Sequence, residues 1–241
     1  MKTLVLQHVD VEHPGIFRDF LRADGIHWDT VELDRGEAIP DLDPYGLMIV
    51  MGGPQDVWQE DEHPWLVAEK QAIRRFAVEL GRPFLGICLG HQLLAEAIGG
   101  RVGPARHPEV GVLTVERTAA GRADPVFANL ADPLTVLQWH SAEVLDLPSA
   151  ATVLARSDKC AVQAFRYGDH AYAMQFHVEL TRDTVREWSV IPAYAAALDK
   201  ALGAGAVTDL DRAVTSRIGR FNADARSMYD GYMATLRSFA A

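Results

Sequence analysis

Residues 83–100 read PFLGICLGHQLLAEAIGG, and they contain the point where a predicted strand meets a predicted helix. The apolar run Phe84–Ile87 predicts a buried strand, whereas Leu89–Ile98 has helical spacing and ends at two glycines. Cys88 lies between them, with a glycine two positions away on each side. Such an elbow lifts a side chain above the sheet, and its crowded backbone requires small neighbours. The stretch therefore favours a nucleophile at Cys88, although a small apolar residue at a helix start fits the same fragment.

Strands and helices alternate on the N-terminal side of this elbow. Thr3–Gln7, His27–Leu33 and Gly46–Met51 read as strands. Helical spacing follows the first strand in Gly15–Asp24 and the third in Pro64–Leu80. This alternation predicts a largely parallel sheet that is covered on both faces. We expect an α/β fold with a flavodoxin-like, open, mixed and mostly parallel sheet and flanking helices.

The pattern changes after Gly100, where short strand candidates are separated by turns. They predict an extension of the sheet by partly antiparallel strands; the candidates are Val112–Glu116, Leu134–Gln138, Thr152–Ser157, Ala161–Tyr167 and Ala171–Phe176. We expect one catalytic domain over residues 1–190 and a C-terminal helical extension over residues 191–241. Apolar residues of the extension recur at helical spacing and are expected to pack back on the domain, with self-association as the alternative: Ile218, Phe221, Met228, Tyr229, Tyr232, Met233 and Leu236.

Composition excludes several classes of function. The 241 residues carry a net charge of -10 without a basic run, so a nucleic-acid partner is not expected. No window approaches the about 18 apolar residues that span a bilayer, and the N-terminal apolar run is too short for a signal peptide. Cys88 and Cys160 are too few for a disulfide framework, and no Cys/His spacing resembles a zinc site. We expect a soluble, cytoplasmic protein without membrane contact.

A second motif, AMQFHVEL, places His177 at the end of an apolar strand. A cysteine nucleophile needs a base that takes its proton and later returns it to a leaving amine. Glu179 can accept a hydrogen bond from the other imidazole nitrogen and orient the ring. Taken singly, His177 is more often a strand-end histidine than a base, and Glu179 more often a solvated surface charge.

A third motif, Gly52-Gly53-Pro54, ends the strand GLMIVM. Glycines at the carboxyl end of a parallel strand bring backbone N–H groups to the ligand crevice. One such N–H group and that of Leu89, at the helix start after Cys88, would form an oxyanion hole. A simple turn is the alternative reading of this motif.

Together, GGP, GICLGHQ and QFHVE resemble the class I glutamine amidotransferase family from about Thr3 to Trp188. The resemblance implies a Cys-His-Glu triad in which Cys88 forms a γ-glutamyl thioester, His177 is the general base and acid, and Glu179 orients it. It also implies an oxyanion hole from the N–H groups of Gly53 and Leu89.

The resemblance extends to the substrate pocket. Gln92 is expected to contact the substrate, the loop Glu109-Val110-Gly111 to hold its α-amino and α-carboxyl groups, and Trp139, His140 and Ser141 to lie beside it. Two departures stand out, because Val178 replaces the usual proline and Ser141-Ala142 replace Gly-Asp. The second departure removes a carboxylate near the α-amino group, which Glu143 could replace.

These features predict a hydrolase that needs neither cofactor nor metal and acts on glutamine or a γ-glutamyl small molecule. Free-standing members resembling the glutaminase domains of GMP synthases pass ammonia to a separate synthetase chain; the γ-glutamyl peptidases hydrolyse γ-glutamyl compounds. A non-catalytic binding relative is the third alternative. We expect a monomer or homodimer. The other histidines show no ligand spacing: His91 is expected to be structural, and His8, His13, His63 and His107 to lie in loops.

Overall fold

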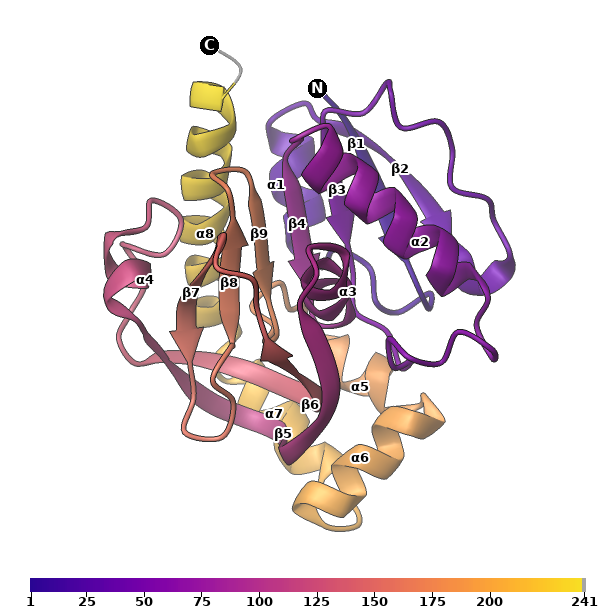
Figure 1. Ribbon diagram of the computed structural model, residues 1–241. Coiled ribbons are helices and arrows are strands. Elements are labelled where there is room, and N and C mark those ends of the chain that lie inside the picture. Colours follow the sequence, from indigo (N-terminus) through magenta and orange to yellow (C-terminus); the bar gives the residue numbers. More distant parts are fainter. Residues whose placement is uncertain (240–241) are drawn as a thin grey trace.

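Five parallel strands form the half of the sheet that carries the site. The computed structural model describes residues 1–239, and in it these strands are β1 (Lys2–Gln7), β2 (His27–Glu32), β3 (Leu47–Val50), β4 (Phe84–Ile87) and β9 (Ala171–Met174). They lie in the order β2-β1-β3-β4-β9 (Figure 1). The carboxyl ends of β1, β3 and β4 therefore lie side by side at one edge of the sheet, where open α/β sheets bind ligands.

Four antiparallel strands extend the sheet beyond β9. They are β8 (Ala164–Tyr167), β7 (Ala151–Arg156), β5 (Arg101–Arg117) and β6 (Leu134–Asp146), in that order. The predicted mixed sheet is confirmed, but β5 and β6 are much longer than predicted. Their pairing is irregular between Pro104 and Glu109, where the sequence RHPE interrupts the apolar pattern. Prolines are tolerated in a strand at such irregularities, so the pattern concealed a continuous ribbon.

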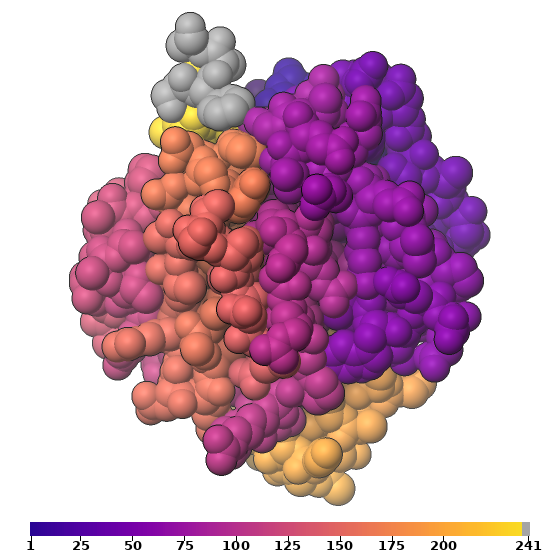
Figure 2. Space-filling view, in the orientation of Figure 1, coloured from indigo at the N-terminus to yellow at the C-terminus, as the bar shows by residue number. Residues whose placement is uncertain are grey.

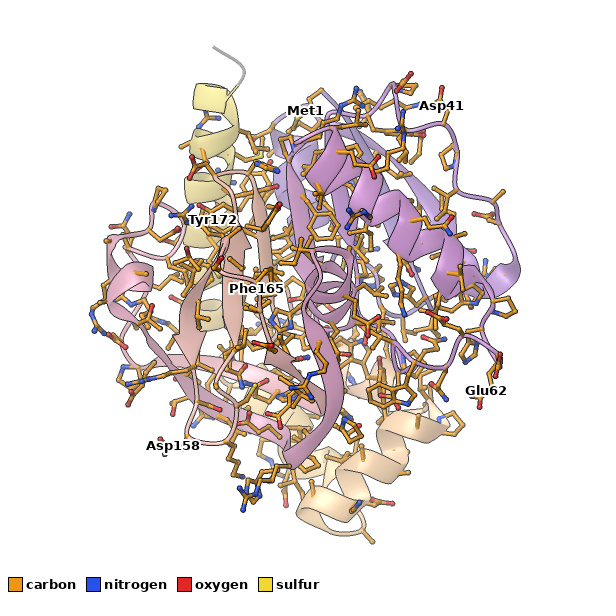
Figure 3. The ribbon with its side chains drawn as sticks, viewed as in Figure 1. Met1, Asp41, Glu62, Asp158, Phe165 and Tyr172 are labelled. Atoms are coloured by element: carbon orange, nitrogen blue, oxygen red, sulfur yellow. The ribbon has the colours of Figure 1, made fainter. Side chains whose placement is uncertain are left out.

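Helices cover both faces of the sheet. On one face lie α2 (Trp65–Ile73), which continues as a π-helical segment over Arg74–Glu79, and α3 (Leu89–Ala97). On the other face lie α1 (Phe17–Ala23) and α8 (Ile218–Phe239) (Figure 1). Figure 3 labels one buried aromatic residue for each face: Phe165 contacts the ring of His91 in α3, and Tyr172 contacts that of Tyr232 in α8.

The C-terminal helices pack on the body of the protein. The short helix α4 (Ala119–Ala123) follows β5, whereas α5 (Thr184–Ser189), α6 (Pro192–Leu202) and α7 (Val207–Thr215) share an apolar cluster with β5 and β6. In Figure 2 the segment around α6 lies against the lower edge of the N-terminal half. The seven apolar residues predicted to pack back on the domain are all buried, which confirms that expectation. The domain boundary near residue 190 stays a prediction.

Within residues 1–239, every helix is too short or too polar to span a bilayer.

Phe221 of α8 offers a test of this packing, because its side chain is fully buried in the apolar cluster that also contains residues of α5, α6 and α7. Replacing it with alanine removes apolar contacts and leaves a cavity, so Phe221→Ala should lower the free energy of unfolding by about 3–5 kcal/mol. Chemical denaturation monitored by circular dichroism measures the change. Asp230→Ala is the matched control in the same helix, since its exposed ion pair with Arg226 contributes about 0.5 kcal/mol or less. A similar loss in both variants would contradict the packing described here.

Candidate active site

Cys88 lies in a strained turn between β4 and α3. Its φ of 52° is positive, and it is the one non-glycine residue of the described chain with such a φ. The Cys88 N–H donates to the Met174 carbonyl of β9 over 2.8 Å, which ties the turn to the neighbouring strand. A positive φ costs a non-glycine residue about 1–3 kcal/mol and persists only where the surroundings impose it. The predicted strand–turn–helix elbow is therefore present.

The two glycines around Cys88 are required by close backbone contacts. A Cβ atom on Gly86 would lie 2.5 Å from the carbonyl oxygen of Gly90. A Cβ atom on Gly90 would lie 2.2 Å from the carbonyl oxygen of Val50 in β3. Both distances are far shorter than van der Waals contact, so only glycine lets α3 begin this close to the sheet.

His177 and Glu179 form a buried pair behind the thiol. Nδ1 of His177 donates to Oε1 of Glu179 over 2.6 Å, and the backbone of His177 pairs with Leu137 of β6. The second carboxylate oxygen accepts the Val178 N–H over 3.0 Å. Valine in place of the proline usual in the resembled family thus supplies a donor that proline lacks. The pair holds the imidazole in one orientation.

The electrostatics of this pair favour an imidazolium. Burial alone would lower the pKa of His177, but the Glu179 charge and the neighbouring Cys88 thiol outweigh it and raise the pKa well above the ordinary value. Nε2 of His177 is buried and has no hydrogen-bond partner within residues 1–239. A proton on this nitrogen is available to the Cys88 sulfur or to a substrate group beside it.

Cys88 opens into a small hollow of about 60 Å³. Seven predicted site residues line it together: Gly53, Cys88, Leu89, Gln92, Trp139, His140 and Ser141. His177 and Glu179 are buried rather than part of its wall. Further lining comes from Pro54, Gln55, Asp56, Ala142, Ala193, Tyr194 and Ala197. One water needs about 10–15 Å³, so a hollow of about 60 Å³ holds only a few groups of that size. It therefore suits a short, unbranched chain.

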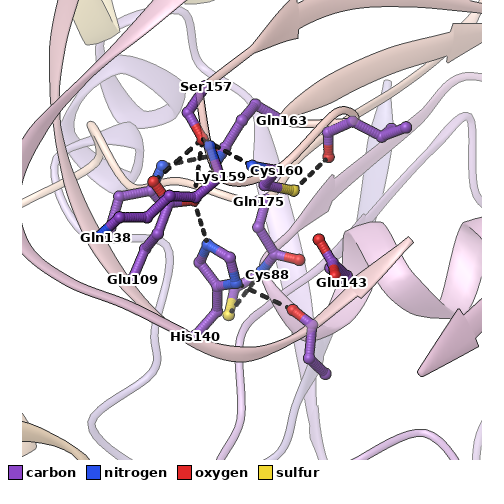
Figure 4. Close-up of polar contacts among 12 residues, drawn as sticks. Cys88, Glu109, Gln138, His140, Glu143, Ser157, Lys159, Cys160, Gln163 and Gln175 are labelled. Atoms are coloured by element: carbon purple, nitrogen blue, oxygen red, sulfur yellow. Dashed lines mark hydrogen bonds and ion pairs between the residues drawn. The ribbon is translucent and has the colours of Figure 1, made fainter. Parts of the chain in front are cut away.

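The structure does not bring Glu109, Val110 and Gly111 to this hollow. They lie in β5 rather than in a loop, and Val110 and Gly111 line a separate surface groove. The Glu109 carboxylate is buried, accepts hydrogen bonds from Ser157 and Gln163, and lies 3.3 Å from Nε2 of His140 (Figure 4). It therefore holds a residue of the wall. Glu143 is also outside the wall, where it accepts the Arg106 N–H.

Two residues near the thiol were not predicted from the sequence. The Gln175 amide donates to the Cys88 sulfur over 3.5 Å (Figure 4). Its oxygen accepts from Gln92 over 3.0 Å. Gln175 belongs to the QFHVE motif, so its proximity could have been inferred from that of His177. Asp56 supplies a half-buried carboxylate to the hollow, and burial raises its pKa.

The C-terminal extension also reaches the site. Tyr194 of α6 lines the hollow, and its hydroxyl donates to Oε1 of the buried Glu12 over 2.6 Å. Burial, Glu12 and Cys88 together raise the pKa of Tyr194 well above its ordinary value. No sequence signal identified Tyr194, because its contact with Glu12 joins opposite ends of the chain.

Cys160, unlike Cys88, lies outside the hollow. It lies in the connection between β7 and β8, where burial raises its pKa to about 12. Its sulfur donates to the Val162 carbonyl. Within residues 1–239, no group of three or more His, Cys, Asp or Glu residues is arranged to hold a metal ion.

Residues 19–187 match the family described as Glutamine amidotransferase class-I, and the chain belongs to this family. It is 35% identical to the glutamine amidotransferase-like protein YfeJ of Salmonella typhimurium, over 77% of this chain and 78% of that protein. It is 30% identical to gamma-glutamyl peptidase 2 of Arabidopsis thaliana, over 72% and 71% of the two chains. The crystal structure of a glutamine amidotransferase from Thermotoga maritima matches with a TM-score of 0.85 and 29% identity over 98% of both chains. The family predicted from the motifs is confirmed.

The His177–Glu179 pair yields a prediction about protonation. Histidine-labelled protein followed by NMR should show His177 protonated at pH 7 and losing its proton only well above pH 6.5. Glu179→Gln removes the opposing charge, so burial should then dominate and lower the pKa of His177. His177 titrating at or below its ordinary value in the unaltered protein would contradict the described geometry, as would an unchanged titration in the variant.

Proposed function

We propose that this protein hydrolyses γ-glutamyl C–N bonds through a covalent thioester on Cys88. The observation that carries the proposal is the buried His177–Glu179 hydrogen bond of 2.6 Å beside a cysteine held in a strained elbow. A thiol, a base and a group that orients the base are the parts that nucleophilic catalysis of acyl transfer requires. Because the thiolate must stay reduced, the proposal includes a reducing, cytoplasmic compartment.

The reaction proceeds in two halves. The Cys88 thiolate attacks the γ-carbonyl carbon, and the N–H groups of Gly53 and Leu89 stabilise the oxyanion. When the C–N bond breaks, its electron pair leaves with the nitrogen, which takes the Nε2 proton of His177. Water then gives a proton to His177 and attacks the thioester, so the C–S bond breaks and glutamate and the thiolate are released.

The hollow supports a glutamyl group as the substrate's common part. Its small volume suits the unbranched glutamyl side chain reaching Cys88, and Gln92 lies in its wall. Asp56 supplies a carboxylate that pairs with the positively charged α-ammonium group of the substrate. Ala142, in the same hollow, offers no charged partner for this group.

Two leaving groups fit this chemistry. The first is ammonia, which is released from glutamine, as the family's description suggests, and is then passed to a separate synthetase chain. The second is the amine of a γ-glutamyl peptide. It is favoured by the likeness to a γ-glutamyl peptidase over most of both chains, and by α6, through which the protein covers part of its own hollow.

The two leaving groups are distinguished by assaying glutamate release from L-glutamine and from a γ-glutamyl dipeptide, with the α-linked dipeptide as control. We expect turnover of at least one γ-linked substrate and none of the α-linked one. Glutamine turnover that requires an added synthetase supports ammonia transfer; turnover of the dipeptide alone supports the peptidase.

Cys88→Ala should abolish this turnover, by at least about a thousandfold in kcat, because the thioester cannot form. Its melting temperature should stay close to that of the unaltered protein. Cys160→Ala is the matched control and should keep full kcat, since Cys160 lies outside the hollow. Turnover retained in the Cys88 variant, or lost equally in both variants, would overturn the assignment of the nucleophile.

A further inference from the structure

A second buried histidine–glutamate pair lies behind the backbone that faces Cys88. His8 follows the end of β1, and Glu69 belongs to α2; both side chains are fully buried. Nε2 of His8 lies 2.9 Å from Oε1 of Glu69, and its Nδ1 lies 2.8 Å from the carbonyl oxygen of Gly52. The Trp65 ring stacks on the imidazole with 5.4 Å between ring centroids. The pair has no contact with solvent and lies outside the wall of the hollow.

The partners of His8 determine its protonation. A carbonyl oxygen and a carboxylate both accept hydrogen bonds, so both ring nitrogens donate and His8 is an imidazolium. Burial opposes this charge, but the Glu69 charge and the hydrogen bonds to Glu69 and Gly52 outweigh it and raise the pKa of His8. A positive charge therefore lies directly behind the Gly52 carbonyl.

The Gly52 carbonyl shares its peptide plane with the Gly53 N–H. In a trans peptide these two groups point in opposite directions, and the cis bond of the described chain lies elsewhere, at Asp132-Pro133. Gly53 lines the hollow beside Cys88 and Leu89. Holding the carbonyl from behind thus turns the N–H toward the hollow.

The same peptide is tightly confined. A Cβ atom on Gly53 would lie 2.8 Å from Cβ of His8, and one on Gly52 would lie 2.6 Å from Oε2 of Glu12. His8 and Glu12 therefore pack closely against this glycine pair. Such contacts leave the peptide plane little freedom to rotate, and the hydrogen bond from Nδ1 selects one orientation.

We infer that His8, held by Glu69, is a positioning residue that orients and polarises the Gly52–Gly53 peptide so that the Gly53 N–H can stabilise the oxyanion formed at Cys88. The inference rests on the proposed hydrolysis. It gives the pair a reason to be charged and buried, since a buried ion pair contributes little to stability compared with apolar side chains of similar volume.

The test separates the two hydrogen bonds of His8. Asparagine places an amide nitrogen near the position of Nδ1, and glutamine places one near that of Nε2. Both substitutions are made together with Glu69→Gln, so that no carboxylate stays buried without a partner. His8→Gln/Glu69→Gln should lower kcat by about 10- to 100-fold with KM within about twofold. His8→Asn/Glu69→Gln should keep at least about tenfold more kcat than that variant. The fall in kcat of His8→Gln/Glu69→Gln should be smaller than the fall of about 100- to 1,000-fold that follows the removal of an oxyanion donor itself.

A second readout excludes a general loss of structure. Alkylation of Cys88 by iodoacetamide needs the thiolate but forms no oxyanion, so its rate should stay within about twofold in both double variants. His63→Gln is the matched control, because His63 contacts the same Trp65 ring from a loop and has no bond to Gly52. Its kcat should be unchanged.

The outcomes are distinguishable. Equal kcat in the two double variants, or a parallel fall in kcat and alkylation rate, would overturn the role of His8 while leaving the hydrolysis in place. An unaltered protein that turns over neither L-glutamine nor a γ-glutamyl dipeptide would overturn the proposed function, and the inference with it.

Discussion

The site depends on a backbone conformation that Cys88 would avoid in an unconstrained chain. Its φ of 52° is imposed by the hydrogen bond to Met174 and by glycines that let β3, β4 and α3 approach within atomic contact. Because β3, β4 and β9 are neighbours, one local strain fixes the thiol relative to the Gly53 turn and to His177. The parallel half of the sheet is thus the frame on which the chemistry is built.

Three buried histidine–carboxylate pairs lie in and behind the site. His177–Glu179, His8–Glu69 and His140–Glu109 are separated by 2.6, 2.9 and 3.3 Å, and all six side chains are almost fully buried. In His177–Glu179 and His8–Glu69 the raised pKa keeps the histidine charged, and such buried ion pairs contribute little to stability compared with apolar side chains of similar volume. The three pairs lie at different parts of the site: His177 beside the thiol, His8 behind the Gly52–Gly53 backbone and His140 in the wall of the hollow. Such an arrangement is a preorganised polar environment, which the proposed hydrolysis would use without rearrangement.

Much of the site could be predicted because its signals are local. The elbow, the glycine pair and the His-x-Glu spacing are short motifs, and a sheet brings the ends of its strands together whatever lies between them. The positions of Tyr194, Asp56 and His8 at or behind the hollow depend on contacts between distant segments, for which one sequence holds no signal. The β5–β6 ribbon was missed for another reason, since prolines and polar residues interrupt its apolar pattern where the pairing itself is irregular. Glu109, expected in a loop, consequently lies in a strand with its side chain buried.

The covalent intermediate gives the most direct test of this account. The protein is mixed with L-glutamine or a γ-glutamyl dipeptide, quenched in acid during turnover and digested, and the peptides are analysed by mass spectrometry. The account predicts a γ-glutamyl adduct on the peptide that contains Cys88 and none on the peptide that contains Cys160. Turnover without an adduct on Cys88, or with the adduct on Cys160, would contradict it.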